Sequence, residues 1–314
     1  MKRMHEYGLK YSGFFAAGVA AVLITVAAVS AVSSDEGPAL RVQALQNQQH
    51  LRETFTRELE LPVGASLNIH NESGRVTIAG WDGDTVAIRV EKRLDLLDGY
   101  SSWFNARPGP PPGLTEEDVA FFESMDLEVR VDETGLNIRS VRDAFAPDVN
   151  FAFHMDVKVP RGTRLNVRVE SGPVNIQGVE AHVAAETGNG KLSCEDISGA
   201  VDVRTHNGGI FLRAIEGTIA AQATNGPVVL DERNMTTAYA IHCETDNGAI
   251  TLSLPGNPSF ELSANTSNGY VKTRLEVAGQ VPAGAVRSLA GPVGAGGPIV
   301  DLRTLNGSIY LDES

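Results

Sequence analysis

The chain is poor in several residue types on which common protein functions depend. Its 314 residues include only 6% aromatic side chains and two cysteines, Cys194 and Cys243, so at most one internal disulfide can form. Clusters of Lys and Arg are missing, and the formal net charge is -13 with a pI near 5.0. Because phosphate contacts require clustered positive charge, this composition argues against binding to nucleic acid.

The residue patterns of catalytic and metal sites are also missing from the sequence. The seven histidines form no metal-binding spacing with cysteine or with one another. There is no nucleophile motif and no phosphate-binding glycine loop. Asp82-Gly83-Asp84 lacks the later acidic ligands of a calcium loop and is interpreted as a turn between strands. We therefore expect a protein that is not an enzyme and that has no cofactor.

The chain does contain a repeat. Asn-Gly or Ser-Gly recurs along it, and three successive intervals are 18 residues long. The pairs are Ser73-Gly74, Ser171-Gly172, Asn189-Gly190, Asn207-Gly208, Asn225-Gly226, Asn247-Gly248, Asn268-Gly269 and Asn306-Gly307. Counted from each glycine, positions -7, -5, +2 and +4 are apolar, with Thr273 as the exception. Alternation of this kind predicts strands with one buried face, and a fixed period near 20 residues predicts stacked units.

The predicted fold is all-β, a single-stranded β-solenoid (β-helix) with rungs of about 18–22 residues. An antiparallel meander is the alternative, because Asn-Gly between strands is also a hairpin signal. Equivalent positions of successive units carry similar side chains, which favours stacked units over the meander. We expect glycine at the turns for a left-handed backbone, and a ladder of asparagine amides beside it. A second ladder, of hydroxyl groups, is predicted from the threonines three residues before the glycine: Thr187, Thr205, Thr245, Thr266 and Thr304. The two cysteines fall at different core columns of non-adjacent units, so we expect them to be free, buried thiols.

The N-terminal segment has the character of a membrane anchor. Residues 13–32 carry no charge and are long enough to cross a bilayer as a helix. Lys2, Arg3 and Lys10 precede this segment, so residues 1–12 are expected in the cytoplasm and the bulk of the chain in the periplasm or outside the cell. Secretion after signal cleavage near Ser33 is the alternative. Residues 33–53 are interpreted as a linker.

The exported part divides by composition. An N-terminal β region is expected over 54–160, regular repeats over 161–277, a Gly/Ala/Pro-rich loop over 278–298 and a final β unit over 299–314. The first region contains an insertion at 93–126, Pro-rich and then helical, with Thr115 as the N-cap. The aromatic residues of this insertion are expected to cap the end of the stack or to contact a partner; they include Trp103, Phe104, Phe121 and Phe122.

Carboxylates gather at the corners of the units. Glu195, Arg213 and Asp231 lie at matching positions of successive units, which predicts alternating charges on a solvated face. Glu232, next to Asp231, is expected at the same exposed corner. A weak calcium site or acid/base chemistry on saccharides would use the same carboxylates, but glycoside hydrolysis also needs a cleft, of which the sequence gives no sign.

Several of these motifs resemble the bacterial putative-adhesin family, a β-strand-repeat domain of unknown function, and more distantly the head domain of putative autotransporter adhesins. The resemblance covers about residues 55 to 311. It rests on Leu67-Asn68-Ile69, Ser73-Gly74-Arg75-Val76, Gly80-Trp81-Asp82-Gly83, Val159-Pro160-Arg161-Gly162-Thr163 and the Asn-Gly units. It implies a β-solenoid of the cell envelope, often behind one membrane segment, without catalytic residues to carry over.

The first functional hypothesis is a noncatalytic envelope protein that acts as an adhesion or scaffolding surface for an unknown envelope protein or glycan, held to the membrane by its N-terminal helix. The second is a membrane-anchored sensory or regulatory partner of an envelope-stress or signalling system. The third is a polysaccharide-active enzyme of the β-helix type, which would need a groove lined by acidic residues on successive rungs.

Overall fold

The computed structural model describes residues 24–25, 50–61, 64–96, 113–132, 135–142, 149–232, 239–282 and 284–313. The segment over 1–12 that is predicted to be cytoplasmic and the predicted membrane helix over 13–32 lie outside these ranges, except for Ile24–Thr25, which form the short strand β1. Within the described ranges, no helix is both long and apolar enough to cross a membrane. Trp103 and Phe104 also lie outside them.

Two sheets built from the same coil form the body of the molecule. Sheet A has twelve strands, in the spatial order β1 (Ile24–Thr25), β2 (His50–Glu60), β5 (Thr85–Leu96), β8 (Val149–Pro160), β4 (Val76–Trp81), β10 (Val174–Val179), β12 (Leu192–Ile197), β14 (Ile210–Ile215), β16 (Val228–Asp231), β18 (Ile250–Leu254), β23 (Ile309–Glu313) and β20 (Val271–Thr273). Sheet B has eleven, in the order β21 (Ser288–Val293), β19 (Phe260–Asn268), β22 (Ile299–Asn306), β17 (Ile241–Asn247), β15 (Ile219–Asn225), β13 (Val201–Asn207), β11 (Val183–Asn189), β9 (Arg164–Ser171), β3 (Ser66–Ser73), β7 (Gly135–Val141) and β6 (Asp126–Asp132).

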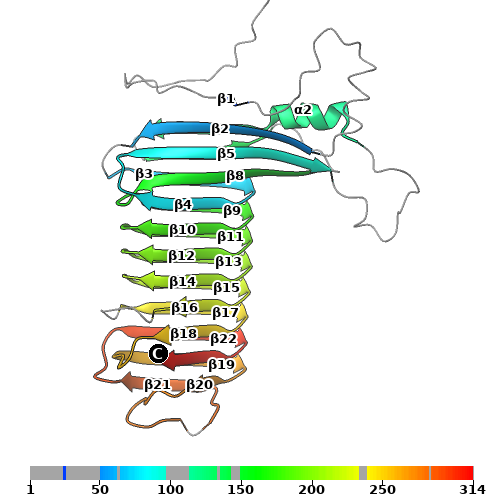
Figure 1. The fold of residues 1–314 in the computed structure, drawn as a ribbon. Helices are drawn as coiled ribbons and strands as arrows, with labels where there is room; N and C mark the ends of the chain where they lie inside the picture. Colours follow the sequence, from blue (N-terminus) through cyan, green and yellow to red (C-terminus); the bar gives the residue numbers. More distant parts are fainter. Residues whose placement is uncertain are drawn as a thin grey trace, which may run out of the picture.

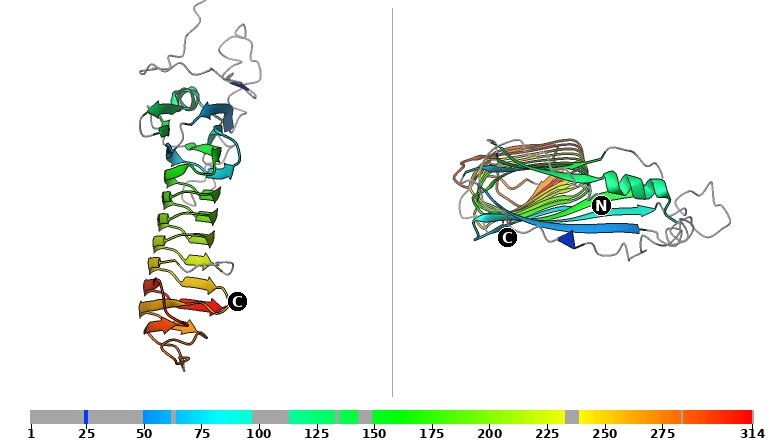
Figure 2. Two further views of the ribbon diagram at one scale, coloured as in Figure 1. Left: turned by 90° about the vertical axis from the view of Figure 1, so that its left-hand side faces the viewer. Right: turned by 90° about the horizontal axis from the view of Figure 1, so that it is seen from above.

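Each regular coil contributes one strand to each sheet, and the coils stack in parallel. In sheet B, Val183 pairs with Val201 and Val201 with Ile219; in sheet A, Leu192 pairs with Ile210. Figure 1 shows these rungs in a single column, and the side view in Figure 2 shows the same column edge-on. The parallel register excludes the antiparallel meander for the regular repeats. The residues at -7, -5, +2 and +4 fill the space between the sheets, with Leu67, Val76, Leu192 and Leu212 at most 2% exposed.

The turns are stacked as closely as the strands. The asparagine ladder is confirmed: Asn207, Asn225, Asn247, Asn306 and Asn268 each donate a side-chain N–H to the amide oxygen of the preceding ladder member, over 2.8–2.9 Å. The threonine ladder takes another form, because each buried hydroxyl donates to a glycine carbonyl of the neighbouring rung, as Thr187 does to Gly172 over 2.9 Å. The turns therefore add side-chain hydrogen bonds to the backbone ladders between rungs.

The predicted reason for glycine, a positive φ, holds at four of the eight turns: φ is 119° at Gly74, 143° at Gly172, 154° at Gly208 and 152° at Gly226. The other four glycines, Gly190, Gly248, Gly269 and Gly307, do not have a positive φ, so another cause selects them. A Cβ at Gly190 would lie 2.2 Å from the carbonyl oxygen of Gly172, and one at Gly307 would lie 1.8 Å from that of Gly248. Successive turns approach too closely for any side chain, so glycine is required at these turns as well.

The order of the rungs differs from the order of the sequence at both ends. The unit β22–β23, predicted as the final one, lies between β17–β18 and β19–β20, because Ile309 pairs with both Ile250 and Val271. At the other end, the unit β3–β4 lies between β7–β8 and β9–β10. The first and last units of the repeat therefore each have a neighbouring rung on both sides.

Three further segments differ from expectation. β2 begins at His50, so the predicted linker over 33–53 ends earlier, and the strand β5 continues to Leu96, inside the predicted insertion. The predicted loop over 278–298 contains β21, which pairs antiparallel with β19 and covers the end of sheet B. β2, β5 and β8 are long strands that project beyond the coil at the other end, as the view along the stack in Figure 2 shows.

The predicted helix is confirmed as α2 (Glu116–Ser124). Thr115 and Asp118 form a reciprocal capping box: the N–H of Asp118 donates to the Thr115 hydroxyl over 3.2 Å and the N–H of Thr115 donates to Asp118 over 2.8 Å. Phe121 is 4% exposed and packs edge-on against Phe151 of β8, with the ring centroids 5.7 Å apart. Lys92 of β5 lies over the Phe122 ring, 4.4 Å from its centroid. These contacts give the two phenylalanines a packing role at the end of the stack.

Candidate interaction surface on sheet B

The outer face of sheet B carries a motif that occurs three times in adjacent strands. Leu136-Asn137-Ile138-Arg139 lies in β7, Leu67-Asn68-Ile69-His70 in β3 and Leu165-Asn166-Val167-Arg168 in β9. The strands pair in register, so the three Leu side chains share the core and the Asn and Arg/His side chains point outward in two columns. The sequence thus places three amides beside three basic groups on one face of the sheet.

The three amides form a hydrogen-bonded column. Asn166 donates to the amide oxygen of Asn68 over 2.8 Å, and Asn68 donates to that of Asn137 over 3.1 Å. Asn137 in turn donates to Asp132 over 2.9 Å. The next residue of this column is Ala184 in β11, which has no polar side chain. The column therefore ends at Asn166, and its amide oxygen makes no hydrogen bond with a described residue.

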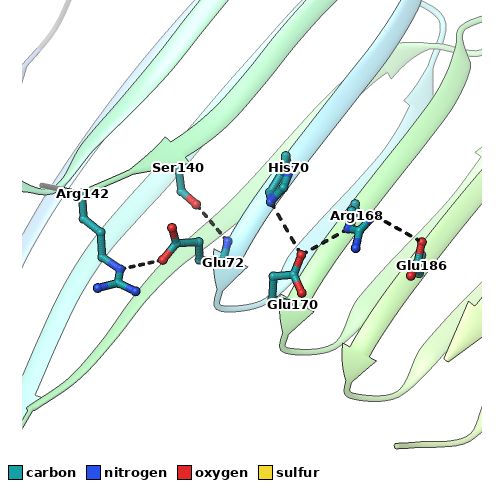
Figure 3. A network of polar contacts seen from close by, with 7 residues as sticks. All are labelled: His70, Glu72, Ser140, Arg142, Arg168, Glu170 and Glu186. Atoms are coloured by element: carbon teal, nitrogen blue, oxygen red, sulfur yellow. Dashed lines mark hydrogen bonds and ion pairs between the residues drawn. The ribbon is translucent and has the colours of Figure 1, made fainter. Parts of the chain in front are cut away.

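Charged side chains beside the amides are linked across the strands, as Figure 3 shows. Glu170 accepts a hydrogen bond from Arg168 over 3.2 Å and lies 3.7 Å from the ring nitrogen Nε2 of His70. Arg168 also lies 3.9 Å from Glu186 on the next rung. These groups are all 41–56% exposed, so each pair contributes at most about 1 kcal/mol to stability.

A second charged pair fixes the β7 edge of the same network. Glu72 of β3 accepts a hydrogen bond from Arg142 over 2.6 Å, and the backbone N–H of Glu72 donates to the Ser140 hydroxyl over 2.9 Å. Ser140 is 1% exposed. These side-chain bonds join β3 to β7 in addition to the backbone ladder, so the outer side chains of the two strands are held in fixed relative positions.

Small residues in β11 make this face hollow. Ala184 lies between Asn166 of β9 and Asp202 of β13, so the longer side chains of those strands surround a shallow groove. The groove has a volume of about 410 Å³ and is lined by Asn68, His70, Asn137, Arg139, Asn166, Arg168, Ala184, Glu186, Asp202 and Arg204, among others. A second hollow of about 320 Å³ continues along the sheet and shares Glu186 and Arg204 with the first.

Other polar groups of the molecule are placed for structure. In the corner column of sheet A, Glu195 pairs in register with Arg213 and Arg213 with Asp231, and Arg213 forms an ion pair with Glu195, as predicted. Glu232 departs from its predicted exposed position, because it is fully buried. Cys194 and Cys243 are free and buried, and burial raises the pKa of both thiols, that of Cys194 to about 12. Neither thiol is therefore a nucleophile at neutral pH.

The predicted candidates and the groove coincide only in part. The Asn-Gly turns lie at the edge of sheet B and build the scaffold, and no prediction had singled out the groove residues Asn137, Arg139 or Arg168. Arg139 was missed because its unit has no Asn-Gly turn, although the three-fold Leu-Asn pattern was a signal that could have located it. Among the described residues, no group of three or more His, Cys, Asp or Glu side chains is placed to hold a metal ion. A possible interaction role of Trp103, Phe104, Phe121 and Phe122 stays a prediction.

The geometry defines an all-β stack of parallel coils with a polar outer face, and family comparison agrees with it. Residues 154–281 match the model of the Toastrack family, DUF4097. This match confirms the resemblance to a putative-adhesin family of unknown function that the sequence motifs indicated. The comparison with curated proteins gives no match.

Solved structures of low sequence identity are also similar to the chain. A putative cell adhesion protein from Clostridium sporogenes is 13% identical, with 84% of this chain and 100% of that chain covered and a TM-score of 0.38. A putative adhesin from Bacteroides fragilis is 11% identical, with 83% and 97% covered and a TM-score of 0.40. A putative lipid binding protein from Parabacteroides distasonis is 9% identical, with 83% and 96% covered and a TM-score of 0.35.

Proposed function

We propose that this protein is a noncatalytic component of the cell envelope that binds a partner, in adhesion or scaffolding, through the outer face of sheet B. The observation that carries the proposal is the groove at Ala184, where amides and charged side chains from adjacent strands converge on one open surface. Those side chains are held in register by backbone ladders and by hydrogen bonds to one another, so little ordering is required when a partner binds.

The chemistry of the surface suits recognition better than turnover. Its arginines and carboxylates are largely engaged with each other, and the groove is open and shallow. Catalytic residues are often buried, and burial shifts their pKa values. The charged side chains of these ion pairs are instead at least one-third exposed. In the same proposal, the uncharged segment at 13–32 anchors the chain and the stack lies outside the cytoplasm.

A groove-filling variant tests the proposal. Full-length protein is labelled and its binding to isolated cell-envelope fragments is measured for wild type, Ala184→Trp and Ser193→Trp. Ala184 points outward from β11 in sheet B, and Ser193 is equally half-buried on the outer face of β12 in sheet A. We expect Ala184→Trp to reduce binding at least tenfold and Ser193→Trp to leave it unchanged, with similar melting temperatures. Equal binding by both variants, or release of envelope sugars by the wild type, would contradict the proposal.

A further inference from the structure

Arg139 is the basic side chain of the groove that the protein leaves unpaired. It is exposed on β7 between His70 of β3 and Glu128 of β6, its partners in register. Glu128 forms its ion pair with Arg130 instead, at 3.0 Å, and Arg139 makes no hydrogen bond or ion pair with a described residue. A guanidinium group offers five N–H donors in a planar fork that matches a carboxylate. Arg139 is therefore available to an external anion.

The charge of the groove contrasts with that of the chain. The formal net charge of the whole protein is -13. The groove is lined by three arginines, Arg139, Arg168 and Arg204, against the two carboxylates Glu186 and Asp202, with His70 in addition. Because this excess of positive charge is small, a ligand with at most one negative charge per sugar residue fits better than a more densely charged polymer such as a polyphosphate, which Glu186 and Asp202 would repel more strongly.

The remaining lining groups are suited to hydroxyl groups. Asn68 and Asn166 each use one amide N–H within the column and have a second N–H left over, whereas Asn137 donates to Asp132 over 2.9 Å and to the Gly135 carbonyl over 3.4 Å. The amide oxygen of Asn166 faces the Ala184 hollow without a partner among the described residues. A hydroxyl group donates one hydrogen bond and accepts others, so both kinds of vacant site along the column can be satisfied by the hydroxyls of a saccharide.

The groove is also elongated along the stack. From Arg139 in β7 to Arg204 in β13 the lining crosses four rung steps, through β3, β9 and β11. At about 4.8 Å per rung, this distance is about 19 Å. The site therefore has room for a chain of several sugar residues that runs along the stack axis.

We propose that the groove binds a linear saccharide that carries carboxylate groups, with one carboxylate on Arg139 and the sugar hydroxyls along Asn68 and Asn166. This inference rests on the proposed function, since it names the class of partner for the same surface. Asn68 pairs in register with Asn137, which lies two residues before Arg139 on β7, so the free amide N–H of Asn68 and the guanidinium can approach neighbouring parts of the saccharide. Because the ion pair forms at an exposed site, binding weakens as the salt concentration rises.

Calorimetric titration of the full-length protein tests the inference. The ligands are short oligogalacturonate and the same oligomer with its carboxylates reduced to alcohols. The variants are Arg139→Gln and Arg89→Gln. Arg89 is an exposed residue of β5 in sheet A and, like Arg139, has no ion-pair partner among the described residues, so both variants change the net charge equally. Melting temperatures confirm that both variants fold.

We expect the wild type to bind oligogalacturonate at least tenfold more tightly than the reduced oligomer. Arg139→Gln should lose about tenfold in affinity for the acidic oligomer, as expected for one charge-assisted hydrogen-bonded pair, and Arg89→Gln should lose none. Equal affinity for both oligomers, no binding of oligogalacturonate, or an unchanged Arg139→Gln would overturn the inference. Tighter binding of polyglutamate or of a phosphate-bearing polymer would overturn it as well. The proposed function survives any of these results if Ala184→Trp still loses binding to envelope fragments.

Discussion

The buried carboxylate of Glu232 accepts a hydrogen bond from the backbone N–H of Ile215, with 2.9 Å between Oε2 and the nitrogen. Ile197 and Ile215 pair in register on the two preceding rungs, but β16 ends at Asp231, so the Glu232 side chain takes the place of the missing strand. The other oxygen, Oε1, is buried without a partner among the described residues. Burial is the main cause that raises the pKa of Glu232 to about 7.

This relationship predicts a pH dependence of stability. The folded state favours the neutral form of the Glu232 carboxyl group, because its pKa is raised. The contribution of this group to the free energy of unfolding is therefore fully present below the ordinary glutamate pKa of about 4.3 and is lost as the pH rises to about 7. Glu232→Gln does not ionise and can still accept from Ile215. We expect the variant to match wild type near pH 4 and to exceed it by a few kcal/mol above pH 7, by urea unfolding. Glu180→Gln, on an exposed corner, is the control, and a constant difference across the pH range would contradict the mechanism.

The asparagine ladder predicts a position-dependent cost. Asn207 donates to Asn189 and accepts from Asn225, whereas Asn268 at the end of the ladder donates to Asn306 alone. At about 1 kcal/mol per hydrogen bond, Asn207→Ala should lower the free energy of unfolding by about 2 kcal/mol and Asn268→Ala by about half as much. Chemical denaturation measures both. Equal losses would contradict a cost that scales with the number of ladder hydrogen bonds.

The close approach of the turns predicts a steric effect at glycine. A Cβ at Gly307 would lie 1.8 Å from the Gly248 carbonyl oxygen, whereas nothing lies within 4 Å of one at Gly162. Gly307→Ala should therefore cost about 1–3 kcal/mol or more, because the rungs on either side cannot separate without breaking ladder hydrogen bonds. Gly162→Ala should stay within about 0.5 kcal/mol of wild type. If the two variants melt at the same temperature, the steric explanation fails.

Thiol accessibility gives a further prediction. Cys194 and Cys243 are both 0% exposed, and burial raises the pKa of Cys194 to about 12. Neither thiol should react with a disulfide reagent in the native protein at pH 8, and both should react fully in denaturant. The reaction is followed spectroscopically. Rapid labelling of one thiol without denaturant would place that strand at a site of local opening.

The sequence predicted the composition of each rung better than the order of the rungs. Alternation and the 18-residue period identify the core columns, since only a strand with one buried face requires that pattern. The period cannot say which unit lies beside which. Ile309 and Val271 are both apolar, so either can lie next to Ile250 in the same core column. Chain order would place Val271 there, but the strand register places Ile309 between Ile250 and Val271.

The candidate groove was predictable in principle from the three Leu-Asn motifs, but two of its properties were not. The hollow depends on Ala184 having longer neighbours on both sides, which requires the register of β9, β11 and β13. The unpaired state of Arg139 depends on Glu128 pairing with Arg130 within its own strand. Both are contacts between side chains whose relative positions a single period does not determine. Glu232 was misplaced for a similar reason, since its burial follows from the early end of β16.

The interleaved rungs affect how the molecule carries mechanical load. Tension applied near Glu313 acts on β23, which is hydrogen-bonded to β18 on one edge and to β20 on the other. In a coil stacked strictly in chain order, the last strand would peel away from one neighbour, one hydrogen bond after another. Here two ladders must shear together before the segment is released, so the arrangement favours resistance to pulling at that end, a property suited to a protein held between two surfaces.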